Sequence, residues 1–329
     1  KVSFSQTGEF SKAEIGRLRF GQTDVQADIY PRKPEGWRID LSGTQLDLKE
    51  WIAQEDDSVV LVKTDPLDLK LDVKLMHLYP NKSLQHVAGE MAFDGWVWHQ
   101  VNVKSSLGEN KNLAIHMTPK GKGRDLRVTS NDAGAALQMF DYYDNLLNGR
   151  LTLTGTYAGM LPNSRFKGRA IVDDFRVVKA PVLAELLNVA SITGILENLT
   201  GLGIAFNKMD VPFENDNGEI KIKNASVSGL SLGLTAEGTL NTDVETIDVK
   251  GTIVPAYALN NALTNIPLIG GLLSGGEKDG GVFAANYTMK GTVKDPKIST
   301  NPLSILAPGF LRNLFKIFDR PADNATQKK

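Results

Sequence analysis

The stretch that decides the fold is PLDLKLDVKL, residues 66–75. Every second residue after Pro66 is apolar, and the positions between carry aspartate or lysine. Successive side chains of a β-strand point to opposite faces. The spacing therefore predicts a strand with one apolar face and one solvated face. The apolar positions are Leu67, Leu69, Leu71, Val73 and Leu75.

The same period of two recurs along much of the chain. Leu230, Leu232 and Leu234 alternate with smaller or polar residues, and so do Phe283, Tyr287 and Met289. These repeats predict a mainly β protein with many strands of the same one-sided kind. Further alternating segments cover residues 16–30, 36–48, 87–103, 113–118, 150–157, 219–227 and 244–254.

A Gly-Thr pair recurs inside these predicted strands. Glycine weakens a strand unless it marks a bulge or a bend, so the repeat predicts a sheet that curves. The spacing between the pairs is not constant, and coincidence in a chain with 31 glycines is the alternative interpretation. The pairs lie at residues 43–44, 155–156, 238–239, 251–252 and 291–292.

Helical patterns interrupt the strands at a few places. Residues 130–147 begin with capping candidates, residues 181–199 begin with a favoured proline, and residues 255–273 are predicted to form two short helices. The last helix is predicted over residues 301–318, with an apolar half opposite a basic half.

The helix over residues 301–318 has three possible roles. It can plug a groove, pack as an ordinary core helix, or bind a membrane interface with anionic head groups. The tail 319–329 is polar and is expected to be disordered. The candidates for a membrane-interface role are Phe310, Leu311, Arg312, Leu314, Phe315, Lys316 and Phe318.

Composition argues against several classes of function. A net charge of −1 lacks the basic footprint of a nucleic-acid binder, and zero cysteines exclude disulfides and thiolate chemistry. The four histidines lie far apart without the spacing of metal ligands. Paired carboxylates such as Asp173 and Asp174 would point to opposite faces of a strand. We therefore expect no enzyme, no cofactor, no metal site and no nucleic-acid partner.

Several blocks resemble the AsmA-like C-terminal family. They are DLRVTSNDAGAAL (residues 125–137) and the segments 143–157, 175–195, 251–291 and 295–315. Together they cover most of the half from Asp125 onward, whereas the first 124 residues resemble the family only through amphipathic strands.

The resemblance implies a mainly β fold with a few helices. In such a fold a long curved antiparallel-type sheet forms a U-shaped groove, with short amphipathic helices at the C-terminal end. Accordingly, residues 1–124 would be a β-groove segment, residues 125–318 the AsmA-like region and residues 319–329 a tail.

The resemblance also implies a location and a role. Family members lie in the periplasm of Gram-negative bacteria, anchored to the inner membrane by an N-terminal helix that is absent from this chain. They resemble bridge-like lipid-transfer proteins that move phospholipid between the inner and outer membranes.

One-sided strands can be covered by a second protein layer or can form a trough that a ligand fills. Acyl chains suit a trough because each buried CH2 contributes about 0.8 kcal/mol without demanding a specific geometry. We therefore expect phospholipid acyl chains as partners, with a membrane surface bound by the C-terminal helices. The alternative is a periplasmic scaffold for outer-membrane assembly that binds envelope proteins through a sheet edge. The groove candidates are Leu67, Leu69, Leu71, Val73, Leu75, Leu230, Leu232, Leu234, Phe283, Tyr287 and Met289.

Overall fold

The computed structural model describes the chain except for residues 54–61, 191–194, 196–198, 200, 256–284 and 302–329. The described residues form 17 strands, which belong to one hydrogen-bonded sheet, and three short helices. The predicted mainly β fold with an extended sheet and few helices is confirmed. The chain divides into two compact units, which are described separately: unit 1 holds Lys1–Val172 and Phe213–Asn217, and unit 2 holds Asp173–Pro212 and Gly218–Lys329.

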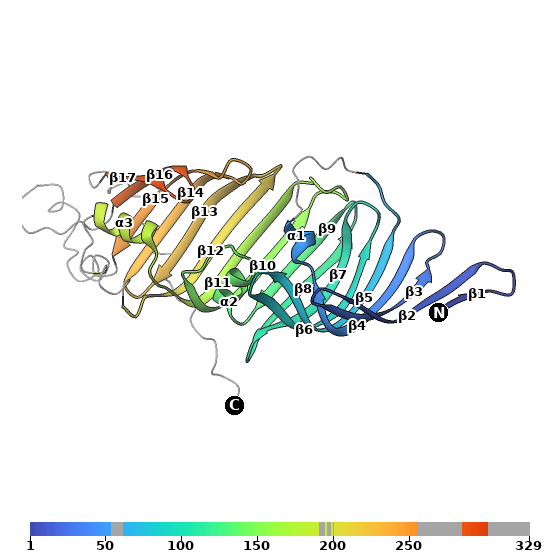
Figure 1. Ribbon diagram of the computed structural model, residues 1–329. Coiled ribbons are helices and arrows are strands. Elements are labelled where there is room, and N and C mark those ends of the chain that lie inside the picture. Colours follow the sequence, from blue (N-terminus) through green and yellow to red (C-terminus); the bar gives the residue numbers. More distant parts are fainter. Residues whose placement is uncertain (54–61, 191–194, 196–198, 200, 256–284, 302–329) are drawn as a thin grey trace, which may run out of the picture. The chain divides into compact units, whose positions relative to one another are not determined.

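Unit 1 is built on a run of ten strands, each paired with its neighbour in the chain (Figure 1). The pairs are antiparallel except β4 with β5, which run parallel. The strands are β1 (Val2–Phe4), β2 (Phe10–Phe20), β3 (Thr23–Pro31), β4 (Trp37–Asp47), β5 (Leu67–Tyr79), β6 (Lys82–Phe93), β7 (Trp98–Gly108), β8 (Lys111–Lys120), β9 (Gly123–Ser130) and β10 (Leu146–Tyr157).

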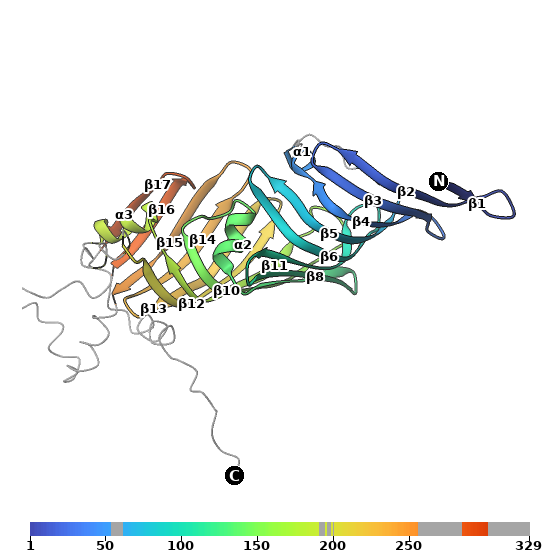
Figure 2. The same ribbon diagram turned by 60° about the horizontal axis from the view of Figure 1, so that its bottom comes forward.

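Two helices belong to unit 1. Helix α1 (Lys49–Ala53) follows β4, and helix α2 (Ala133–Met139) follows β9 and contacts β10 (Figure 2). The Asp132 carboxylate caps α2 by accepting a hydrogen bond from the Ala135 backbone N–H at 2.8 Å. The helix is shorter than the predicted 130–147, because Asp141 turns the chain with a φ of 62° and β10 begins at Leu146.

The boundary between the units falls within β11 (Phe166–Val177), and β12 (Ile204–Asp216) also contributes to both. The boundary expected between residues 124 and 125 lies inside β9. Unit 2 continues with an antiparallel meander. Its strands are β13 (Glu219–Gly229), β14 (Leu232–Asn241), β15 (Thr246–Pro255), β16 (Ala285–Thr292) and β17 (Pro296–Asn301).

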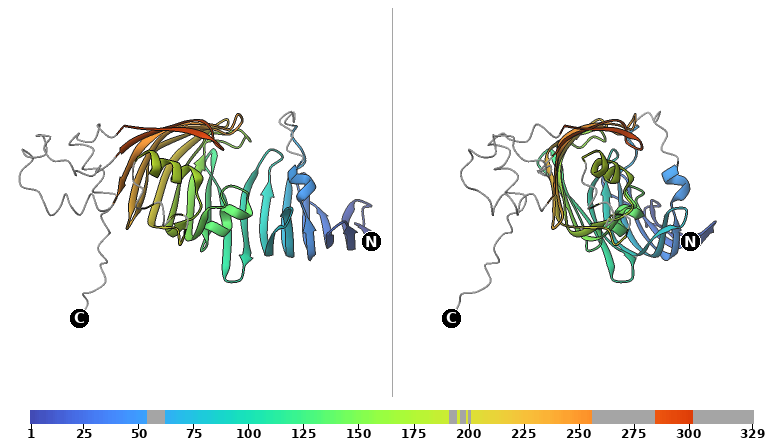
Figure 3. Two further views of the ribbon diagram at one scale, coloured as in Figure 1. Left: turned by 60° about the vertical axis from the view of Figure 1, so that its left-hand side comes forward. Right: turned by 90° about the vertical axis from the view of Figure 1, so that its left-hand side faces the viewer.

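Helix α3 (Pro181–Val189) lies on the concave side of the curved strands of unit 2 (Figure 3). The Thr300 hydroxyl on β17 donates a hydrogen bond to the Val189 carbonyl oxygen at 3.0 Å. The described helix covers the first part of the predicted 181–199. The predicted helices at 255–273 and 301–318, with all seven membrane-interface candidates, lie outside the described residues.

Two glycines of the Gly-Thr pairs make room for an aromatic side chain on the next strand. A Cβ on Gly251 would collide with the Thr235 carbonyl oxygen and lie 2.7 Å from the Tyr287 hydroxyl. A Cβ on Gly155 would collide with the Phe166 ring. At these two positions a side chain is excluded by close packing between strands.

Candidate functional site

One face of unit 1 is apolar from β2 to β10. The strand register aligns aliphatic side chains into two rows, which together we call the apolar face. Row one is Ala13, Ile29, Ile39, Leu69, Met91, Val101, Met117 and Leu126. Row two is Ile15, Ala27, Leu41, Leu71, Val103, Ile115, Val128 and Leu153, with Gly89 between Leu71 and Val103.

The opposite face of the same strands is polar. One register row there consists of Glu14, Asp28, Asp40, Lys70, Glu90, Asn102, His116 and Arg127. The two faces therefore differ as the alternating sequence predicts, because neighbouring residues of a strand point to opposite sides.

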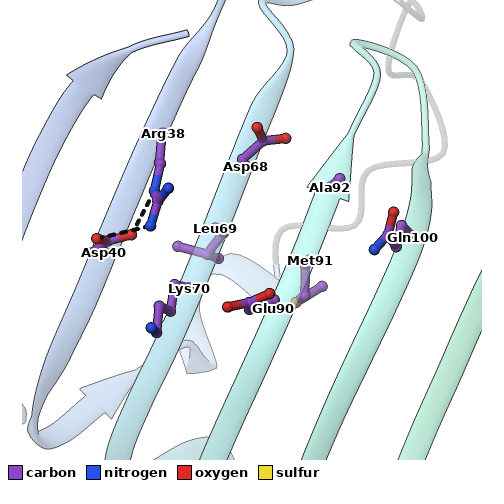
Figure 4. A pocket seen from close by; sticks show the side chains of 9 residues that line it. All are labelled: Arg38, Asp40, Asp68, Leu69, Lys70, Glu90, Met91, Ala92 and Gln100. Carbon is purple, nitrogen blue, oxygen red and sulfur yellow. Dashed lines mark hydrogen bonds and ion pairs between the residues drawn. The ribbon is translucent and has the colours of Figure 1, made fainter.

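A shallow pocket of about 270 Å3 lies among residues of β4, β5, β6 and β7 (Figure 4). Charged side chains dominate its lining, and the Arg38 Nε donates to the Asp40 carboxylate at 3.1 Å within it. Both side chains are solvated, at 55% and 32% exposure. The pocket is a hollow between solvated surface charges.

The apolar face is only partly covered by protein. Ala27, Leu71 and Val101 are buried, and the other members of both rows are half-buried. A closed two-layer core buries such side chains fully, at the packing density of an organic crystal. Among the described residues, therefore, no second layer of protein seals the apolar face along its length.

One end of the apolar face is closed by the two helices of unit 1. Val73, Met76, Leu84 and Leu113 form a buried cluster there with Ala136 of α2. Ile52 of α1 and Met139 of α2 pack against the same cluster. At this end, side chains of the two helices cover the strands in the place that a ligand would otherwise take.

The other end of the strands carries paired aromatic side chains, which we call the aromatic border. Phe10 packs edge-on against Trp37, and Phe93 lies 5.4 Å from Trp98 between ring centroids. Phe166 lies 4.6 Å from Tyr157 and 5.7 Å from Phe213 by the same measure. Tyrosine and tryptophan combine an apolar body with a polar tip, a property that suits the boundary between hydrocarbon and water.

The groove candidates on β5 lie at or near the apolar face, with one change of phase. Leu71 and Val73 are buried, whereas Leu67, Leu69 and Leu75 are half-buried. From Met76 onward the buried positions of the strand are even-numbered, so Leu75 is outside the buried cluster. The change occurs beside His86 of β6, whose φ of 49° accompanies a shift in register against β7.

The groove candidates of unit 2 have a different environment. Leu232 and Tyr287 are buried, at 0% and 4% exposure, and Leu234 and Met289 are half-buried. Leu186 and Leu187 of α3 are also buried. Leu230 is 71% exposed between β13 and β14, and Phe283 lies outside the described residues.

Several residues of the apolar face were not among the sequence candidates. Met91, Val101, Ile115 and Met117 lie in segments that alternate, but alternation does not show which strands become neighbours. Their place in a continuous row follows only from the register. The sequence signal that could have found them is the same period of two that marked β5.

Two further features concern the described part of the chain only. No group of three or more His, Asp or Glu side chains there could hold a metal ion. None of its helices has the length and apolar character needed to span a bilayer.

Comparisons of the chain with protein-family models, curated proteins and solved structures give no match.

Proposed function

We propose that the protein binds the acyl chains of phospholipids on the apolar face of unit 1 and transfers them without covalent chemistry. The observation that carries the proposal is the pair of half-buried aliphatic rows that run in register from β2 to β10. Contiguous apolar surface of this kind, left uncovered, marks a site for a ligand or partner.

The dimensions of the apolar face suit hydrocarbon. Eight strand spacings separate β2 from β10, which corresponds to about 38 Å at 4.8 Å per spacing. An acyl chain spans about 15 Å, half of the roughly 30 Å hydrocarbon core of a bilayer. The apolar face therefore exceeds the length of one chain and has room for more than one position of the same ligand.

The chemistry of the two rows also favours acyl chains over a protein partner. A protein interface gains most of its binding energy from a few anchors in well-packed pockets. Rows of Ile, Leu, Val and Met offer repeated, similar contacts, so a chain gains about 0.8 kcal/mol per buried CH2 at any position along them. Such a surface has no single deep energy minimum, so a lipid can move along it.

A crosslinking experiment tests lipid binding. A photoreactive amino acid is placed at Met91 or Ile115 on the apolar face, and in matched variants at the adjacent Glu90 or His116 on the polar face. Protein purified without detergent is irradiated and examined by mass spectrometry. We expect lipid adducts at Met91 and Ile115 only. Equal labelling of both faces, or no adduct at any position, would contradict the proposal.

The resemblance to the AsmA-like family supports a wider proposal, in which the transfer takes place between the inner and outer membranes of a Gram-negative envelope. The test uses donor vesicles with a fluorescent phospholipid and unlabelled acceptor vesicles. Met91→Glu is expected to slow transfer, because it places a charge on the apolar face, whereas Glu90→Gln leaves the rate unchanged. Transfer rates that do not depend on the protein would reject the proposal.

A further inference from the structure

Arg124 is the second residue of β9. Its side chain lies on the same face as that of Leu126, next to the aromatic border. Only 5% of its surface is exposed, which is rare for an arginine without a charged partner. Its Nη1 donates a hydrogen bond to the Trp98 carbonyl oxygen at 3.0 Å. Its guanidinium carbon lies 4.3 Å from the ring centroid of Tyr157, its register partner on β10.

The hydrogen-bonding capacity of Arg124 is not used up by these contacts. Its Nε is buried and has no hydrogen-bond partner, and it forms no ion pair with the described residues. Guanidinium donors lie in the plane of the group, and the guanidinium carbon lies over the Tyr157 ring, which offers no lone pair to Nε. An N–H group that is buried without an acceptor costs about 1–3 kcal/mol.

Two neighbours define the electrostatics around Arg124. Burial lowers the pKa of its guanidinium, and the electrostatic interactions with Tyr157 and Asp94 act in the opposite direction. The Asp94 carboxylate itself accepts hydrogen bonds from the backbone N–H groups of Trp96 and Val97, at 2.9 Å each. An arginine remains protonated at neutral pH, so the buried guanidinium carries a positive charge that forms no ion pair with the described residues.

His99 provides a second unsatisfied nitrogen at the same border. It adjoins Trp98 in β7, where the register against β6 shifts between the Ala92–Gln100 and Phe93–Trp98 pairs. Its Nδ1 is buried and has no hydrogen-bond partner. Two such nitrogens, on β7 and β9, are unusual, because the large majority of buried side-chain polar atoms are hydrogen-bonded in folded proteins.

We infer that Arg124 binds the anionic head group of a lipid, with His99 as an adjacent hydrogen-bonding group, and that the lipid tail lies on the apolar face. The inference rests on the proposed function. It adds that the site prefers a lipid with a phosphate monoester or carboxylate head group to one with a zwitterionic or neutral head group. A charged acceptor beside the guanidinium would compensate the charge of Arg124, and it would satisfy the Nε donor once the side chains that cover this atom move aside.

The geometry along β9 fits such a ligand. Six residues separate Arg124 from Ser130, beside which α2 begins, and six residues of strand correspond to about 20 Å. An acyl chain of about 15 Å fits between the head-group position at Arg124 and the end closed by α2. The tail then contacts Leu126 and Val128 of the two rows.

The test compares three detergents that share a dodecyl chain and differ in the head group: dodecyl phosphate, dodecylphosphocholine and dodecyl maltoside. Binding to the full chain is measured by calorimetry below the critical micelle concentrations, with inorganic phosphate as a fourth ligand. We expect dodecyl phosphate to bind at least about tenfold more tightly than the other two detergents. Arg124→Met is expected to remove this preference while all three detergents still bind.

Two further variants control the result. Arg127→Met, three residues along the same strand on the polar face, is expected to keep the preference. Arg124→Lys keeps the charge without the Nε donor and is expected to retain only part of it. If Arg124→Met does not fold, the comparison of head groups on the wild type and on Arg124→Lys still tests whether Arg124 binds the head group.

The outcomes separate the two proposals. Equal binding of the three detergents to the wild type, or a preference that survives Arg124→Met, overturns the role of Arg124 and leaves lipid binding intact. Inorganic phosphate binding as tightly as dodecyl phosphate overturns it too, because the tail would then contribute nothing. Failure of every detergent to bind contradicts the proposed function itself.

Discussion

The hydroxyl of Tyr287 links two strands of unit 2 across a glycine. It donates a hydrogen bond to the Thr235 carbonyl oxygen at 2.7 Å, while the side chain lies close to Gly251 of β15. Burial raises the pKa of Tyr287 to about 12. One residue therefore combines packing, hydrogen bonding and a titration that is coupled to folding.

The titration of Tyr287 predicts a loss of stability at alkaline pH. In the unfolded chain a tyrosine ionises near pH 10, whereas the folded pKa is about 12. The stabilising contribution is thus fully present below pH 10 and is lost as the pH rises to 12. Tyr287→Phe should lower the free energy of unfolding by about 1 kcal/mol at pH 8.

Urea unfolding of the wild type and of Tyr287→Phe at pH 8, 10 and 11 checks this prediction. Lysines and the other tyrosines titrate in both proteins, so the difference between them isolates Tyr287. The two free energies should converge as the pH rises above 10. A constant difference would show that the hydroxyl is not protected from ionisation by folding.

Because Gly251 has no side chain, both β14 and the Tyr287 side chain can lie close to β15 at this position. A Cβ there would collide with backbone, which cannot move without disturbing the strand pairing. Gly251→Ala should therefore destabilise the protein by roughly 2 kcal/mol or more. Gly16→Ala is the matched control, because a Cβ at Gly16 of β2 has no atom within 4 Å. Thermal denaturation of both variants measures the effect, and similar melting temperatures would contradict it.

At the scale of elements, α2 closes one end of the apolar face and depends on its N-terminal cap. The Asp132 carboxylate accepts a hydrogen bond from the Ala135 N–H and pairs with the Lys111 ammonium at 2.9 Å. Asp132→Ala should cost about 1–2 kcal/mol, because both contacts are lost. Asp132→Asn should cost less, since an amide oxygen still caps the helix.

Unfolding in urea distinguishes these two variants of Asp132. An alanine variant as stable as the asparagine variant would show that the cap is not required. If α2 closes the apolar face as described, hydrogen exchange in Ala133–Met139 should also accelerate in the alanine variant.

At the scale of the whole molecule, one isoleucine from each unit shows how burial divides support of the fold from contact with a ligand. Ile253 of β15 is 0% exposed, whereas Ile115 of β8 is half-buried. Ile253→Ala should therefore cost about 2–5 kcal/mol and leave lipid adducts in unit 1 unchanged. Ile115→Ala should cost less and weaken lipid binding.

Crosslinking at Met91 measures lipid binding in both isoleucine variants, and urea unfolding measures their stability. Because both variants replace isoleucine by alanine, their comparison separates a residue that supports the fold from one that contacts the ligand. Equal destabilisation by the two variants would mean that Ile115 is packed as fully as Ile253.

The sequence alone determined the strands and the difference between their two faces. Alternation over residues 66–75 predicts a one-sided strand because backbone sterics point successive side chains in opposite directions, which needs no information from distant residues. The change of phase between Val73 and Met76 was not predictable in the same way, because it follows from a register shift between two other strands.

Only the tertiary structure decided which apolar faces are covered and where a charge lies among them. Whether Met91 or Leu232 is sealed depends on the helices and strands that pack beside it, and these contacts join residues far apart in the chain. Arg124 reads in the sequence as an ordinary solvated residue near a turn. Its burial against Tyr157 and Trp98 comes from the pairing of separate strands, because long-range packing, and not local sterics, sets the solvent exposure of a side chain.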